Sequence, residues 1–189
     1  MMAAVMRHLV ELARDGDLAA FSQLASASIA DLYAVARLIL RDTPRAEDAV
    51  QDALVEAWRS IRGLRDPDRF EAWMHRLVVR MCHRHGRIQT RRDVVELHLL
   101  DTDAALPGDA AVSLADRDQL ERGFRRLPLD QRAVIVLHFY RGLPLTDVAD
   151  ILAIPTGTAK SRLHRATQTL RAALEADARE PGLAKGRIA

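Results

Sequence analysis

The chain is poor in several residue types, and each shortage excludes a class of protein. Only one of its 189 residues is cysteine, which rules out an internal disulfide and fits a reducing compartment. Aromatic residues make up 4% of the chain and glycines number 9, so we expect an aliphatic core. The abundance of alanine and leucine favours helices over strands, because both residues lose little on entering a helix.

Long apolar runs are scarce as well. Charged residues interrupt the first 17 positions, unlike the apolar centre of a signal peptide. No uninterrupted apolar run approaches the roughly 20 residues that a membrane-spanning helix needs. We therefore expect a soluble cytoplasmic protein that does not insert into a membrane.

The formal net charge is only +2, so the distribution of charge matters more than its sum. Nearly all basic residues are arginine, whose planar guanidinium suits bidentate contacts to phosphate and guanine. A codon bias towards GC would enrich arginine in the same way, so composition alone does not establish nucleic-acid binding.

Hydrophobic periodicity predicts an all-α chain of two small helical domains. We expect a helical bundle over residues 1–92, a helix-turn-helix domain over 118–175 and a flexible tail over 176–189. Residues 93–117 carry Asp101, Asp103, Asp109 and Asp116 and a Leu-Pro-Gly sequence, which predicts an extended acidic linker.

The best-defined helix of the first domain follows from its apolar stripe. Thr43 and Pro44 make a good helix start, after which apolar residues recur every three or four positions. A helix of this kind must pack against others to bury its stripe, which predicts a bundle. The stripe consists of Ala46, Ala49, Val50, Ala53, Leu54, Ala57, Trp58 and Ile61.

The second domain carries the pattern of a helix-turn-helix. Thr146 is a candidate cap for a short helix, residues 153–155 make the turn, and Thr156 or Thr158 can cap the final helix. The outer face of that helix is basic and polar, with no acid between residues 156 and 171, which suits the major groove of DNA. The alternative is a solvated charged face on an ordinary helical hairpin. The candidate contacts are Lys160, Ser161, Arg162, His164 and Arg165.

Two charged faces are expected on the first domain. The arginine ladder consists of Arg76, Arg80, Arg84 and Arg87, which repel one another unless a polyanion lies against them. Two explanations remain open. The ladder is either a nucleic-acid surface or a row of arginines that lay their apolar stems over the bundle and keep their charged ends in water. The acidic face consists of Glu47, Asp48, Asp52 and Glu56 and is either a solvated helix face or a docking surface for a basic protein.

Catalytic and metal patterns are weak. Cys82, His83 and His85 do not converge on one tetrahedral site at their spacing on a helix, and no second ligand pair accompanies them. There is no glycine-rich phosphate loop and no nucleophile elbow. We therefore expect no catalytic residue, no metal, no cofactor and no enzymatic activity.

Four segments together resemble a known family. The runs AEDAVQDALVEAWRSI and FEAWMHRLVVRMCHRHGR resemble region two of the extracytoplasmic-function (ECF) sigma factors, a subfamily of the sigma-70 family that serves bacterial RNA polymerase. The run from Leu127 to Leu174, which includes GTAKSRLHRA, resembles their region four. With the opening ARDGDLAAFSQL, the resemblance covers nearly the whole chain except the linker and the tail.

The resemblance implies a function and a set of contacts. Such proteins bind core RNA polymerase through its clamp helices and flap, and direct it to promoters for transcription initiation. The linker would thread the active cleft of polymerase, and an anti-sigma factor often restrains such proteins. The implied polymerase-binding residues are Asp48, Gln51, Asp52 and Glu56; the −10 residues are Arg62, Arg65, Arg69, Arg76, Arg80, Arg84 and Arg87; the −35 residues are Lys160, Ser161, Arg162, His164 and Arg165.

The sequence also departs from the family pattern. Arg80 stands where the family more often has asparagine, and Arg84 where an acid is common. Both lie in the helix implied to follow the −10 strand, so no −10 sequence preference is derived. The alternative function is a helix-turn-helix repressor whose first domain dimerises or binds a small ligand, and which acts without polymerase.

Overall fold

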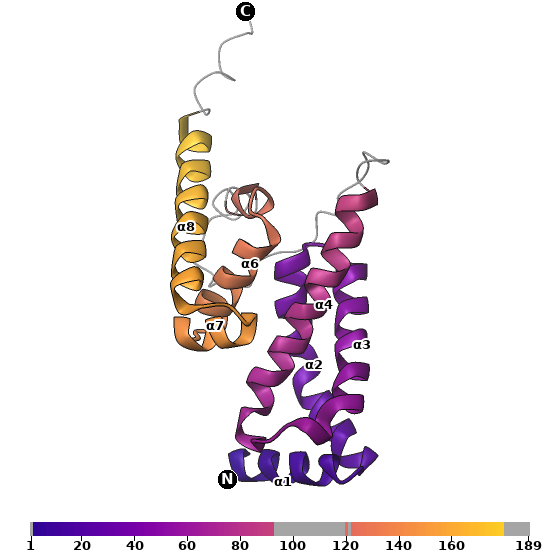
Figure 1. Ribbon diagram of the computed structural model, residues 1–189. Coiled ribbons are helices and arrows are strands. Elements are labelled where there is room, and N and C mark those ends of the chain that lie inside the picture. The colour runs from indigo at the N-terminus through magenta and orange to yellow at the C-terminus, as the bar shows by residue number, and fades with distance from the viewer. Residues whose placement is uncertain (1, 93–119, 121, 180–189) are drawn as a thin grey trace, which may run out of the picture.

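The computed structural model describes residues 2–92, 120 and 122–179, and no strand occurs in this part of the chain (Figure 1). The predicted all-α fold is confirmed there. The predicted linker over 93–117 and most of the predicted tail lie outside the described residues.

Four helices form the N-terminal bundle. Helices α2 (Leu18–Leu40), α3 (Thr43–Ser60) and α4 (Phe70–Arg92) pack against one another, and α1 (Met2–Arg14) crosses one end of them (Figure 1). Two short 3-10 turns, η1 (Ile61–Gly63) and η2 (Pro67–Arg69), connect α3 to α4. The predicted stripe of α3 faces inwards, with Ala46, Ala49, Val50, Ala53, Ala57 and Ile61 buried.

Aspartate side chains fix where these helices begin. The Asp17 carboxylate accepts hydrogen bonds from the backbone N–H groups of Ala19 and Ala20 and caps α2. Asp42 caps α3 in the same way by accepting from Arg45, so this helix begins at Thr43 and Pro44 as expected. Each cap satisfies N–H groups that have no partner inside their own helix.

Helix α2 occupies the centre of the bundle. It is the one helix in the described residues long and apolar enough to cross a membrane by length and composition, which qualifies the expectation that no such run exists. Nine of its 23 residues are buried in the bundle, among them Leu24, Leu32, Val35 and Ile39, so part of its apolar character serves the core, while Leu18 and Ile29 are exposed.

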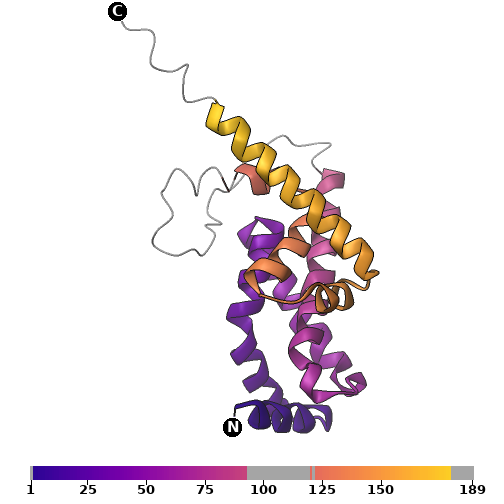
Figure 2. The same cartoon turned by 90° about the vertical axis from the view of Figure 1, so that its left-hand side faces the viewer.

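The C-terminal domain consists of several short helices and the long helix α8, and lies beside the bundle. Residues 120 and 122–125 are helical, and are followed by α6 (Leu129–Ile135), the π-helical turn η3 (Val136–Tyr140), α7 (Leu145–Leu152) and α8 (Thr156–Arg179). Helix α8 is the outermost layer, and α6 and α7 lie between it and the bundle (Figures 1 and 2).

The capping predictions for this domain were wrong in detail. Helix α7 begins at Leu145 after Pro144, whose carbonyl accepts the N–H groups of Asp147 and Val148, so Thr146 lies inside the helix. Helix α8 likewise follows Pro155, and Thr156 is its first helical residue. The turn between them was placed correctly. Ala153 ends α7 in the left-handed region, at φ 52°.

The two domains touch each other. Helix α7 packs against α4, and α6 and η3 pack against α2. Helix α6 also approaches α4 closely at Gly86, because a Cβ atom at this position would lie 2.4 Å from a terminal methyl carbon of Leu129.

Candidate nucleic-acid interface

Helix α8 presents the predicted −35 face to solvent. Its inner side is anchored by three alanines at seven-residue spacing, Ala159, Ala166 and Ala173, all buried. The polar side chains that alternate with them point away from this anchor. Lys160, Ser161, His164 and Arg165 are exposed.

Arg162 departs from the rest of this face. Its guanidinium lies 2.9 Å from the carboxylate of Asp130, which precedes it by 32 positions, and its side chain is only 28% exposed. The sequence pattern could not indicate this contact, because the acid lies on a different helix. Arg162 is therefore engaged within its own domain in this conformation.

The arginine ladder runs along the exposed side of α4. The opposite side of the same helix is buried through Phe70, Leu77, Val78 and Met81, and Trp73 beside them is half-buried. The expectation that these arginines need an external polyanion was incomplete, because the neighbouring helix α3 supplies acids. Arg80 lies 3.1 Å from a carboxylate oxygen of Glu56, and Arg84 lies 3.9 Å from Asp52.

The acidic face of α3 is thereby divided in two. Glu47, Asp48 and Gln51 are exposed to solvent. Asp52 and Glu56 lie at the border with α4, and Asp52 also contacts the ring of His85 at 3.0 Å. The candidate polymerase-docking residues and the candidate DNA-binding residues therefore share an edge of one small domain.

The loop between α3 and α4 forms a cleft of about 670 Å³ with the C-terminal domain. Of the three predicted loop arginines, Arg65 and Arg69 line this cleft together with Arg76, while Arg62 lines a separate pocket near Gly16. Helix α7 closes the cleft with Asp147, Asp150 and Ile151.

The cysteine and histidines of α4 do not converge, as the sequence indicates. Cys82 is buried, and desolvation raises the pKa of its thiol to about 12. His83 and His85 contact different acids, Asp130 at 3.3 Å and Asp52 at 3.0 Å. Burial also lowers the pKa of His83 below its ordinary value, against the opposing effect of Asp130.

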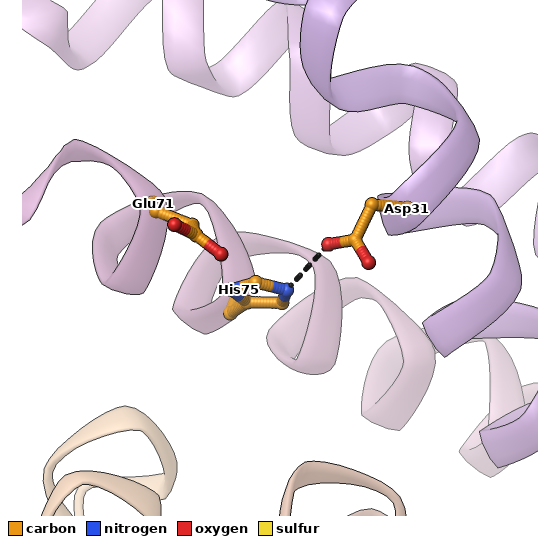
Figure 3. Close-up of side chains that lie close together, drawn as sticks. All are labelled: Asp31, Glu71 and His75. Carbon is orange, nitrogen blue, oxygen red and sulfur yellow. Dashed lines mark hydrogen bonds and ion pairs between the residues drawn. The ribbon is translucent and has the colours of Figure 1, made fainter. Parts of the chain in front are cut away.

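Sequence reasoning missed a cluster at the domain contact. Asp31 of α2 and Glu71 and His75 of α4 place ligand-type atoms within 4.8 Å of one another (Figure 3). The buried His75 ring lies 3.0 Å from the Asp31 carboxylate. Arg141 of the C-terminal domain donates to both Asp31, at 2.8 Å, and Glu71, so the chain itself balances the two negative charges. Only the Glu71–His75 spacing of four residues was visible in the sequence, because Asp31 and Arg141 are remote from both.

Comparison with known proteins identifies the family of this chain. The model of "Sigma-70 region 2" matches residues 24–92, and that of "Sigma-70, region 4" matches residues 123–172. The ECF RNA polymerase sigma factor SigM of Mycobacterium tuberculosis is 32% identical over 155 residues, which cover 82% of this chain and 77% of SigM. The chain belongs to the ECF sigma factors.

Further relatives agree with this assignment. The ECF sigma-E factor of Escherichia coli is 30% identical over 175 residues, covering 86% of this chain and 90% of that protein. Among solved structures, the sigma factor RpoE of Bartonella quintana, in complex with the anti-sigma factor NepR, has a TM-score of 0.67 at 27% identity, covering 83% of this chain and 98% of that one. CnrH, in complex with the cytosolic domain of CnrY, has a TM-score of 0.65 at 26% identity, covering 92% and 99%. The chain is thus a polymerase-binding promoter-specificity factor, and the repressor alternative is not supported.

Proposed function

We propose that this sigma factor recruits core RNA polymerase with the acidic face of α3 and reads promoters with α4 and α8. One observation carries the proposal: a polar face on α8, an exposed arginine row on α4 and an acid-rich face on the neighbouring α3 occur in one chain. As a member of its family, the chain acts as an initiation factor in the cytoplasm and not as an enzyme.

The −35 element is assigned to the first half of α8. Lys160 and Arg165 are exposed cations able to donate to guanine edges or phosphates, and Ser161 and His164 add polar contacts beside them. Arg162 joins this set only when its contact with Asp130 is given up.

The −10 element is assigned to the arginine ladder and the loop before it. Unstacked bases need a basic track and pockets, and Arg65, Arg69 and Trp73 line a cleft at the start of the ladder. The expected −10 contacts are Arg62, Arg65, Arg69, Arg76, Arg80, Arg84 and Arg87.

Polymerase docking is assigned to Asp48, Gln51, Asp52 and Glu56. The apolar side chains Ile29 and Val55 are exposed nearby, and a protein partner that covers them gains free energy from burial. We further propose that an anti-sigma protein binds the chain, since its structural relative RpoE of Bartonella quintana was solved with the anti-sigma factor NepR.

The test is reconstitution with purified core RNA polymerase. The tagged chain should co-purify with core enzyme and start transcripts at discrete positions on a promoter library. The variant Asp48→Ala should lower co-purification, whereas Glu11→Ala, an exposed acid on α1, should not. Absence of both a complex and discrete starts would refute the proposal.

A further inference from the structure

Arginines assigned above to the −10 strand are already occupied by the C-terminal domain. The Asp150 carboxylate of α7 lies 3.2 Å from Nη2 of Arg69. The backbone carbonyl of the same residue accepts a hydrogen bond from Nη2 of Arg76 at 2.7 Å. One acidic residue of region 4 therefore presents two oxygens to two arginines of region 2, as a backbone phosphate would.

A second contact fastens the same two domains. The Arg141 guanidinium contacts Asp31 of α2 and Glu71 of α4. These two acids lie on either side of the buried ring of His75 (Figure 3). Because the Arg141 side chain is only 25% exposed, this contact is the better shielded of the two. Arg69, Arg76 and Asp150 line the cleft described above, which does not include Arg141.

A third contact includes the recognition helix. The Asp130 carboxylate lies 2.9 Å from Arg162 of α8 with one oxygen and 3.3 Å from His83 of α4 with the other. A single carboxylate thus bridges the −35 helix and the −10 helix.

This arrangement is incompatible with simultaneous contact to both promoter elements. Their names place them roughly 25 base pairs apart, which is about 85 Å of B-form DNA at 3.4 Å per step. In the structure one carboxylate spans the two helices that would read them. The domains must therefore separate before both elements are bound.

We propose that region 4 of the free chain is an intramolecular competitor of promoter DNA, with Asp150 standing in for a phosphate on Arg69 and Arg76. The proposal rests on the −10 role assigned above and adds a closed state that holds those arginines back until the domains are drawn apart. Exposed ion pairs of this kind are individually weak, so the closed state is reversible and its population is sensitive to single charges.

The test uses the full chain with two fluorophores, attached through Ser26→Cys on α2 and Ala172→Cys on α8, both exposed positions. The native cysteine is buried and stays unlabelled. Energy transfer is measured for the parent, for Asp150→Asn, for Arg141→Ala and for the matched control Glu175→Gln, an exposed acid on α8. Affinity for a random-sequence single-stranded 12-mer is measured on the same proteins at one salt concentration.

We expect both interface variants, but not the control, to lower energy transfer. Asp150→Asn should raise affinity for the single strand by about two- to five-fold, because losing an exposed ion pair shifts the equilibrium by that factor. Unchanged energy transfer in both variants would overturn the closed state, and lower transfer with affinity at the control level would overturn the competition. If adding Arg80→Ala to the Asp150→Asn variant leaves its affinity unchanged, the −10 assignment itself fails, and the competition with it, whatever the fluorophores report.

Discussion

The guanidinium of Arg80 lies 3.1 Å from the carboxylate of Glu56, so a candidate DNA-binding cation and a candidate polymerase-binding anion form one ion pair. The two side chains are 57% and 38% exposed. Water and salt screen an exposed pair of this kind, so it contributes little to the free energy of unfolding of the bundle. The pair matters more for its position, because it joins the acidic face of α3 to the arginine ladder of α4.

We therefore expect a small coupling energy between these residues. A double-mutant cycle of Glu56→Ala and Arg80→Ala in urea unfolding should give about 0.2–1 kcal/mol. A coupling above about 2 kcal/mol would show that the pair is structural and would weaken both functional assignments.

The stability of the bundle should depend on α2. Leu24 is fully buried, and Leu24→Ala should lower the free energy of unfolding by about 2–5 kcal/mol through lost burial and the cavity left behind. Leu18, on the same helix, is 61% exposed, and Leu18→Ala should change it by less than about 0.5 kcal/mol. Equal effects of the two changes in urea unfolding would contradict the placement of α2 at the centre of the core.

The inward faces of the helices could be predicted because a repeat between residues close in the sequence determines them. The stripe of α3 and the core side of α4 depend on a repeat of three and four residues, and most of these positions are buried, while Leu54, Trp58 and Trp73 are half-buried. The turn at residues 153–155 was also visible, since proline after a short apolar helix disfavours its continuation. Caps were less predictable, because Pro144 and Pro155 set helix starts that threonine side chains were expected to set.

The contacts of the charged side chains could not be predicted in the same way. Arg76 meets Asp150 across 74 positions, and Arg80 meets Glu56 across 24. No periodicity links such residues, since their meeting depends on how helices and domains pack. The sequence therefore indicated which faces carry charge, but not which charges are already paired.

The thiol of Cys82 should be unreactive in the native protein. It is fully buried, and desolvation raises its pKa to about 12, so almost no thiolate forms at pH 8. Alkylation by iodoacetamide should be slow in buffer and fast in urea, as followed by mass spectrometry. Rapid modification of the folded chain would show that α4 opens readily, contrary to the packing described here.

Stability should fall on acidification because of His83. Burial lowers the pKa of this imidazole below its ordinary 6.5, Arg87 and Arg162 lower it further, and Asp130 opposes them. The unfolded chain therefore binds the proton more readily, so the contribution of His83 is present above about pH 6.5 and is lost as the pH falls below it. The variant His83→Gln should flatten this part of the curve of melting temperature against pH. His8→Gln, at an exposed position on α1, should leave the curve as it is. An unchanged slope in His83→Gln would contradict the assignment.

The −35 assignment gives the sharpest prediction for promoter binding. Arg165 is exposed on α8, and Arg165→Ala should weaken holoenzyme binding to a −35-dependent promoter by about 1–3 kcal/mol if the side chain holds a guanine with two hydrogen bonds. The effect should be confined to promoters that carry the matching base, because a phosphate contact would weaken all sequences alike. Arg59→Ala, which removes an exposed arginine of α3 outside every proposed contact, is the matched control. Footprinting or filter binding with a set of single-base promoter variants separates the two cases. Uniform weakening would move Arg165 to the phosphate backbone, and unchanged affinity would remove it from the interface.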